Sequence, residues 1–342
     1  MVRADDRSTR TRWIANGLVV GIPSLALTWL MILFAEAVAR DGKNPPFVDW
    51  IVHGSAVGRV FAGQALFEAR QLSGTYFLPD TVPAGYAYPP ASVLPLIPFS
   101  GTLLGLVAWL ALNIGVFLSG LWAALRRDLG DRTVVPFAFV LLGLMFFLPF
   151  ASGVISANAN LANAGIYAWC WAIGRTEGRI GLVAGLAAVV KVFPGALVLW
   201  PTGRARRESL VLAIGVAVGL TVVSLPLVGL QSWIDFPVAI SNALLSCGEG
   251  RYSVPCALQP LLGTGGAKLA AIALGGLVLI AALRTRNDRL AFVLFGVAML
   301  VPVPDMHPHY WLIAYVAAVV LIGGLLASRR RPDVQANQTS VH

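Results

Sequence analysis

Long apolar runs separated by short clusters of arginine make up most of this chain. A helix of about 20 apolar residues crosses the hydrocarbon core of a bilayer. The pattern therefore predicts an all-α, polytopic transmembrane helical bundle with about eight full spans and a few short half-membrane helices. The spans are expected near residues 13–35, 102–124, 133–150, 161–174, 208–229, 267–283, 290–304 and 310–327.

The composition supports a membrane protein. Hydrophobic residues make up 57% of the chain and charged residues 12%, whereas soluble proteins carry roughly a quarter charged residues. The net charge of +9 would suit a nucleic-acid ligand, but the basic residues stand in short clusters between apolar runs, where they act as topology signals. The pattern argues against nucleic-acid binding.

The arginine clusters predict the orientation, because basic residues stay on the cytoplasmic side. With both termini cytoplasmic, most of the 25 lysine and arginine residues fall on that side. We expect a basic N-terminus over 1–12, a single membrane domain over 13–331 and a disordered polar tail over 332–342.

One apolar stretch does not fit a simple crossing. A single span over 180–202 would place Arg204, Arg206 and Arg207 outside. A broken pair of helices that turns near Lys191 to Pro194 keeps this cluster inside, and we favour it over one continuous span. Backbone broken at membrane depth must be buried in protein or line a cavity.

Two polar segments are predicted on the extracytoplasmic side. The first, 36–101, is the expected catalytic loop, and its run Ala91 to Phe99 predicts a short, half-buried helix because it is too brief to span and contains prolines. The second, 231–266, holds Cys247 and Cys256. These cysteines could form a disulfide on an oxidising face, or both could stay reduced.

Ionisable and amide side chains gather toward the same predicted face. Ionisable groups at membrane depth cost about 2.5–3.5 kcal/mol, so they indicate function. The candidate site residues are Asp49, His53, Tyr88, Asn158, Asn160, Lys191, His307 and His309.

Asp49 is the candidate general base. If a helix begins here, Asp49 and His53 are four residues apart and share a face. A carboxylate so placed can take the proton of an attacking hydroxyl, which accelerates such reactions by about 10²–10⁴-fold. The alternative is an interfacial helix cap.

Lys191 and the histidines are candidates for binding a phosphate. Lys191 precedes Pro194 by three residues, so it could sit in an opened helix and meet a phosphate as a point charge, or it could extend to the cytoplasmic surface. His307 and His309 could bind a metal, but Asp305 is the only nearby third ligand, so we predict no metal site and favour hydrogen bonding to phosphate. A divalent metal requirement stays open, and no other cofactor is expected.

Nucleotide and hydrolase motifs are absent from the sequence. It contains no glycine-rich phosphate loop ending in Gly-Lys-Ser/Thr, no Gly-x-Ser-x-Gly elbow and no Asp-x-Asp pair. An activated group for synthesis would therefore have to be carried by a lipid.

The order of short motifs resembles glycosyltransferase family 87, polytopic enzymes of the GT-C superfold that include mannosyltransferases of actinobacterial phosphatidylinositol-mannoside synthesis. The resemblance covers about 13–327. Its motifs are Asp49 with His53, Gly63 to Phe67, Tyr88-Pro89-Pro90, Asn158 with Asn160, Lys191 to Pro194, and His309.

The resemblance implies a bacterial plasma-membrane enzyme with its site facing the periplasm or cell exterior. Its donor would be a polyprenyl-phosphate sugar such as polyprenyl-phosphate-mannose, and its acceptor a lipid or glycan hydroxyl. Transfer would invert the anomeric centre, with Asp49 as base and with Lys191 and His309 on the donor phosphate. A transporter or lipid flippase with a polar intramembrane site is the alternative; the long first loop and the lack of an internal repeat favour the enzyme.

Overall fold

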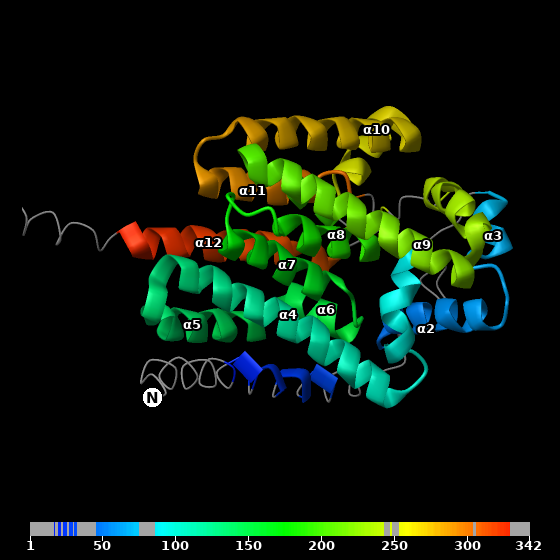
Figure 1. Ribbon diagram of the computed structural model, residues 1–342, viewed down its shortest axis with the longest axis horizontal. Coiled ribbons are helices and arrows are strands. Elements are labelled where there is room, and N and C mark those ends of the chain that lie inside the picture. Colours follow the sequence, from blue (N-terminus) through cyan, green and yellow to red (C-terminus); the bar gives the residue numbers. More distant parts are fainter. Residues whose placement is uncertain are drawn as a thin grey trace, which may run out of the picture.

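The chain folds into an elongated bundle of helices in this computed structural model (Figure 1). The structure describes residues 17, 20–21, 23–25, 27–29, 31–32, 46–74, 86–242, 247, 253–303 and 306–328. These residues form helices and no strands, which confirms the all-α prediction for this part of the chain. The predicted N-terminal segment 1–12 and the tail 332–342 lie outside it.

The elements follow the chain in a simple order. They are α2 (Val48–Phe61), α3 (Ala69–Leu72), η1 (Pro90–Phe99), α4 (Leu103–Leu129), η2 (Gly130–Thr133), α5 (Val134–Met145), α6 (Leu148–Ile155), α7 (Asn160–Ile173), α8 (Ile180–Val190), η3 (Phe193–Leu199), α9 (Gly203–Asn242), α10 (Val254–Arg284), α11 (Asp288–Leu300), η4 (Pro308–Trp311) and α12 (Leu312–Ser328).

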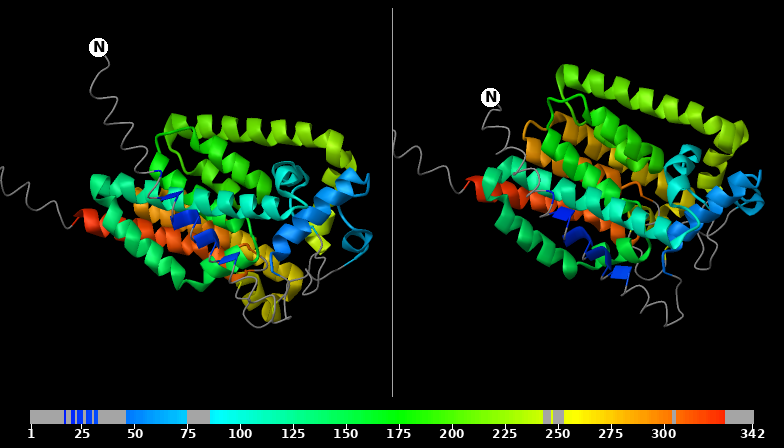
Figure 2. Two further views of the ribbon diagram at one scale, coloured as in Figure 1. Left: turned by 90° about the horizontal axis from the view of Figure 1, so that it is seen from below. Right: turned by 60° about the horizontal axis from the view of Figure 1, so that its bottom comes forward.

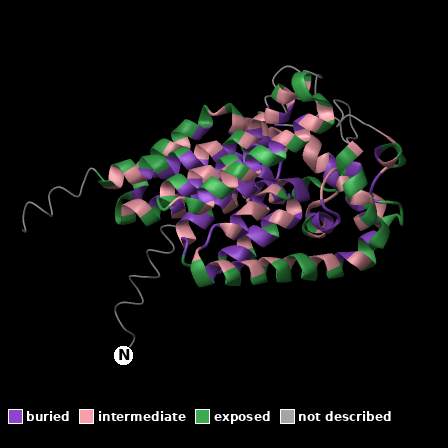
Figure 3. Cartoon of the chain, turned by 90° about the horizontal axis from the view of Figure 1, so that it is seen from above, coloured by how far each residue is buried: buried purple, intermediate pink, exposed green. Residues whose placement is uncertain are grey.

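Four helical segments of the described chain are long and apolar enough to cross a membrane: Leu103–Met145, Gly203–Asn242, Val254–Arg284 and Pro308–Ser328. The outer faces of α9 and α10 carry exposed Val211, Ile214, Leu269 and Leu277, and Figure 3 shows buried residues concentrated between the helices. Apolar surface of this extent suits lipid. The protein is thus a membrane protein, and the number of about eight spans stays a prediction.

Several predicted boundaries differ from the observed ones. The expected span 133–150 is broken, because α5 ends at Met145 and Pro149 stands in the first turn of α6. The predicted loop 231–266 is largely helical. Helix α9 bends at Gly229 (φ +71°) and α10 at Gly263 (φ +66°), and both helices continue past these kinks. The predicted spans instead ended at 229 and began at 267.

The break in 180–202 is confirmed. Helix α8 ends at Val190, Lys191 is extended (φ −143°, ψ 132°), and η3 begins at Phe193. The two ends of the segment meet, since the amide N–H of Thr202 donates to the carbonyl of Arg175 over 2.9 Å. The pair therefore returns to the end from which it started.

The central contact of the bundle joins α4 and α7. A Cβ atom at Gly120 would lie 2.3 Å from the carbonyl oxygen of Gly165, and one at Gly165 would lie 2.4 Å from that of Val116. Only glycine at both positions allows the two backbones to come this close. Fully buried Phe117, Leu121 and Tyr167 surround the crossing.

The two ends of the bundle differ in chemistry (Figures 1 and 2). At the end with the α4–α5 and α10–α11 turns, the Arg289 guanidinium bonds both carboxylate oxygens of Asp128 at 2.8 Å. Arg175 pairs with Asp288 there at 2.9 Å. Helices α2 and α3 lie at the opposite end.

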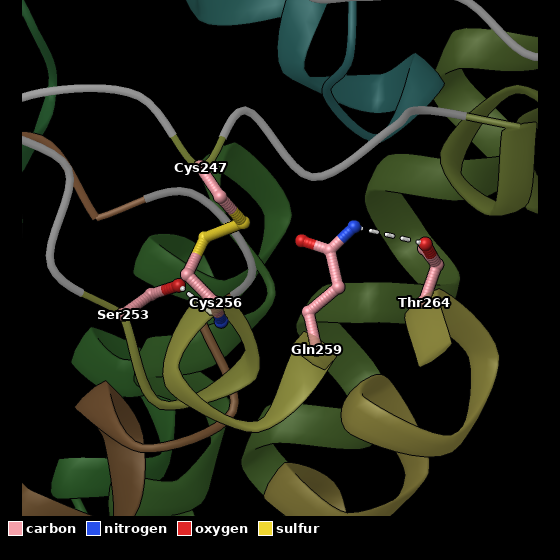
Figure 4. Close-up of a disulfide and its surroundings, with 5 residues drawn as sticks. All are labelled: Cys247, Ser253, Cys256, Gln259 and Thr264. Atoms are coloured by element: carbon pink, nitrogen blue, oxygen red, sulfur yellow. Dashed lines mark hydrogen bonds between the residues drawn. A yellow bond between two sulfur atoms is a disulfide. The ribbon is translucent and has the colours of Figure 1, made fainter. Parts of the chain in front are cut away.

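A disulfide between Cys247 and Cys256 lies at the start of α10 (Figure 4). Their Cα atoms are 5.4 Å apart. The Ser253 side chain caps α10 by accepting from the Cys256 amide N–H over 3.2 Å. The cap and the disulfide together fix the first turn of α10.

Candidate active site

Asp49 lies in the first turn of α2, which is held against the end of α6. Phe47, with a left-handed φ of +60°, turns the chain into the helix. Its amide N–H donates to the Ile155 carbonyl over 2.6 Å, and that of Asp49 donates to the Ser156 carbonyl over 3.1 Å. The carboxylate is therefore placed from two distant parts of the sequence.

Asn158 stands in the tight turn between α6 and α7. Ala157 before it has a φ of +53°, and its carbonyl accepts from the Trp109 indole N–H over 2.9 Å. The Asn158 amide N–H donates to the Gly153 carbonyl over 2.9 Å. These bonds fix a strained turn and aim the Asn158 side chain at α2.

The side chain of Asn158 joins Asp49 to Lys191. Its Nδ2 donates to Asp49 Oδ2 over 2.7 Å, and its Oδ1 accepts from Lys191 Nζ over 3.2 Å. Oδ1 also accepts from the Asn160 amide N–H over 2.8 Å. The reverse amide orientation would place oxygen against carboxylate and NH₂ against ammonium. The carboxylate and the ammonium are thus bridged by one amide, with no direct ion pair between them.

Lys191 is buried between two tyrosine rings. Its side chain extends from the break after α8, with Nζ 5.3 Å from the Tyr88 ring centroid and 4.9 Å from that of Tyr310. Nζ also lies 3.5 Å from the Tyr310 hydroxyl. Aromatic faces stabilise a desolvated cation. An ammonium has three donors, so with Asn158 and Tyr310 in contact one remains for a ligand.

Tyr88 completes the contacts of the carboxylate. Its hydroxyl lies 3.4 Å from Asp49 Oδ1. Burial raises the pKa of Tyr88 well above its usual value, and the nearby Asp49 charge raises it further. The phenol therefore stays protonated and points its donor at the carboxylate.

His53 shares the α2 face with Asp49 as predicted, but it does not contact the carboxylate by a hydrogen bond. Its buried ring packs edge-on against Tyr88, with centroids 4.7 Å apart. Burial lowers the pKa of His53 to about 4, against an opposing effect of Asp49 and with a further lowering by Lys191. His53 is therefore a neutral ring that supports Tyr88.

The two C-terminal histidines stack next to Tyr310, one of the two tyrosines that contact Lys191. His309 is buried and stacks on Tyr310 (5.1 Å) and on His307 (5.4 Å). Both ring nitrogens of His309 lack a hydrogen-bond partner in the described chain. The same holds for the side-chain Nδ2 and Oδ1 of the buried Asn160. Buried polar atoms of this kind are normally satisfied, so they are available to a polar ligand.

No three histidine, cysteine, aspartate or glutamate side chains converge on one point in the described ranges. Asp305, the third group considered with His307 and His309, lies outside these ranges. The residues described thus offer no ligand set typical of a metal site.

The structure gathers Asp49, Tyr88, Asn158 and Lys191 into one hydrogen-bonded or ring-packed cluster, with His53 and His309 against its aromatic rings. Sequence reasoning missed Tyr310, which contacts the lysine by ring and hydroxyl. No local signal in the sequence distinguishes it from other tyrosines near membrane interfaces.

Comparison with known proteins identifies the family. The model of glycosyltransferase family 87 matches residues 86–304, more than half of the chain. No curated protein and no solved structure gives a significant match. The matched region includes Tyr88, Asn158 and Lys191, whereas Asp49, His309 and Tyr310 lie outside it. The chain therefore belongs to glycosyltransferase family 87 and is a membrane glycosyltransferase.

Proposed function

We propose that this enzyme moves a hexose, with mannose as the expected sugar, from a polyprenyl-phosphate donor to a hydroxyl of a lipid or glycan acceptor. The reaction takes place at the extracytoplasmic face and inverts the anomeric centre. Asp49 is the general base, and Lys191 binds the donor phosphate.

The observation that carries the proposal is the chain of contacts Asp49, Asn158 and Lys191. A transferase of this kind needs a base on the acceptor side and a cation on the leaving-group side, a short distance apart. The Asn158 amide provides this spacing, because its two ends bond the carboxylate at 2.7 Å and the ammonium at 3.2 Å.

In the proposed step, the acceptor oxygen attacks the anomeric carbon from the side opposite the phosphate. The hydroxyl proton passes to the Asp49 carboxylate as the new C–O bond forms. The bond between the anomeric carbon and the phosphate oxygen breaks, and its electron pair remains on polyprenyl phosphate. Negative charge grows on this leaving group, where Lys191 stabilises it.

The remaining polar groups support the donor. The Lys191 ammonium lies 4.9 Å from the centroid of the Tyr310 ring. The His309 ring, whose nitrogens lack a hydrogen-bond partner in the described chain, stacks on the same tyrosine at 5.1 Å. We assign His309 a hydrogen bond to a phosphate oxygen, and Asn160 a hydrogen bond to substrate through its unpartnered amide. His307, stacked on His309, holds that ring in place.

The location of the site supports the extracytoplasmic assignment. The cluster lies at the α2 end of the bundle, away from the arginine-rich turns (Figure 1), and basic clusters mark the cytoplasmic side. The disulfide supports an oxidising environment on the site's side.

The test is transfer of radiolabelled mannose from polyprenyl-phosphate-mannose to lipid and glycan acceptors by purified protein in nanodiscs. We expect transfer by the wild type and a loss of at least 100-fold in Asp49→Asn, with donor affinity retained. Lys191→Met should instead lose donor affinity. Asp131→Asn, at the exposed arginine-rich end, is the matched control.

Full activity in Asp49→Asn would remove the proposed base. Transfer from another polyprenyl-phosphate sugar in place of mannose would correct the sugar and leave the mechanism intact. Absence of donor binding in the wild type would contradict the lipid-phosphate donor itself.

A further inference from the structure

An apolar groove runs along the membrane bundle away from the Asp49 cluster. It has a volume of about 1050 Å³ and lies between the described N-terminal helical positions, α4 and α7. Figures 1 and 2 show this N-terminal segment, in blue, alongside α4. The groove begins at Ala111, two residues after Trp109, whose indole bonds the carbonyl of Ala157, and it continues to the last turn of α4.

Small residues line this groove on both of its walls. Gly17 and Gly21 face it from the N-terminal helix, and Ala111, Gly115 and Ser119 from α4. Stripes of this kind normally let two helices touch, as α4 and α7 do. Here a Cβ added at Gly17, Gly21 or Gly115 would meet no atom of the described residues within 4 Å. The described residues therefore leave space along this groove, and its apolar walls favour an acyl chain over water.

Two arginines close the groove at one end. Arg126 and Arg127 both line it. The Arg127 guanidinium stacks on Trp171 at 4.4 Å, whereas Arg126 makes no hydrogen bond or ion pair within the described chain. The nearest acid in sequence, Asp128, is occupied by Arg289. Two guanidinium groups thus lie where the apolar groove ends.

We infer that this groove binds an acidic phospholipid, with an acyl chain between the N-terminal helix and α4 and its phosphate at Arg126 and Arg127. Charge complementarity selects this occupant, because an acidic headgroup brings net negative charge to the two arginines, whereas a zwitterionic headgroup also brings a cation. The lipid fills the gap between the N-terminal helix and the bundle, and its contacts with both stabilise the position of that helix. This site is separate from the proposed sugar-transfer site.

Binding of phosphatidylglycerol and of phosphatidylcholine to delipidated protein in detergent, followed by native mass spectrometry, tests the inference. Phosphatidylglycerol should bind more tightly. Arg126→Gln should weaken phosphatidylglycerol binding about fivefold, the usual share of one arginine beside an anionic headgroup, and weaken phosphatidylcholine binding less. Arg132→Gln, on the same end of the molecule but outside the groove, should behave as wild type.

Gly115→Leu should abolish phosphatidylglycerol binding by filling the groove. Gly276→Leu in α10, where an added Cβ also meets nothing within 4 Å, is the control for a larger side chain on a membrane helix. Equal binding of the two lipids by wild type, or wild-type binding by Arg126→Gln and Gly115→Leu, would overturn the inference. So would loss of polyprenyl phosphate alone in Gly115→Leu, which would assign the groove to the donor chain. Conversion of a lipid-free dimer to monomer by Gly115→Leu would assign it to a second copy.

Discussion

Asn158 is the residue on which the geometry of the site depends, since each end of its amide bonds an opposite charge. In Asn158→Asp, a second carboxylate would face Asp49, and two carboxylates at this distance cannot both ionise easily. The pair would share a proton and titrate with a raised apparent pKa.

We therefore expect Asn158→Asp to lower kcat by about 10- to 100-fold at neutral pH and to move the acidic limb of the pH–rate profile upward. The profile, measured for wild type and variant, checks this. An unmoved limb would show that Asn158 does not set the ionisation of Asp49. Asn163→Asp, one helical turn into α7, is a control for an added acid near α7.

His53 gives a prediction for stability, because burial lowers its pKa to about 4 from an unfolded value of 6.5. Between these values the unfolded state binds a proton that the folded state does not, so stability falls as pH falls from about 6.5 to 4. Below pH 4, this group lowers the free energy of unfolding by about 3 kcal/mol relative to its value above pH 6.5.

His53→Gln should lose this dependence. The measurement is the thermal midpoint in detergent between pH 7 and pH 4, taken as the difference between wild type and variant so that other titrating groups cancel. The difference in thermal midpoint between wild type and variant should become smaller toward low pH. A difference that does not change with pH would contradict a neutral buried imidazole.

At the scale of elements, the crossing of α4 and α7 depends on Gly120 and Gly165. Gly120→Ala places a methyl group 2.3 Å from a backbone oxygen that cannot move freely. We expect a loss of about 1–3 kcal/mol and a thermal midpoint lower by several degrees. Gly115→Ala lies five residues earlier on the same helix, and no atom of the described residues lies within 4 Å of the added carbon. It should be neutral or slightly stabilising.

The helices also show which features of the fold could be predicted from the sequence. Apolar runs and arginine clusters were enough to predict helices, and the placement of Arg204, Arg206 and Arg207 was enough to predict the break at Lys191. The bends at Gly229 and Gly263 could not be predicted, because a glycine with proline before it can end a helix or kink it, and tertiary packing decides which.

The residues of the site could be predicted from the sequence more fully than the contacts between them. Asp49, Asn158 and Lys191 were singled out because each is costly in an apolar setting. Their bonding depends on the contact between the start of α2 and the end of α6, which joins Asp49 to a residue 109 positions away in the sequence and has no local signal. Tyr310 was missed for the same reason: tyrosine is common near membrane interfaces, and only the three-dimensional position of Lys191 distinguishes this one.

At the scale of the whole molecule, the disulfide and the arginine clusters predict one orientation. In this predicted orientation, the Asp49 end faces an oxidising exterior, and the end with Arg175 and Arg289 faces the cytoplasm. Exposed positions at the two ends test this, since the one native cysteine outside the disulfide, Cys170, is buried.

A cysteine introduced at Gln64, exposed near the end of α2, should react with a membrane-impermeant maleimide on intact cells. One at Arg132, exposed in η2, should react only after the membrane is opened. The reverse labelling would invert the topology and place sugar transfer on the cytoplasmic side.

The amide bridge of Asn158 has a consequence for charge during turnover. Under the proposed reaction, Asp49 loses its negative charge to the incoming proton while the departing phosphate gains one beside Lys191. The net charge of the cluster is the same before and after transfer, and only its position shifts across one amide, from the NH₂ end to the carbonyl end. No counterion need enter or leave the protein as the sugar moves. Each cycle is reset by two departures, that of a proton from Asp49 and that of the lipid phosphate from Lys191.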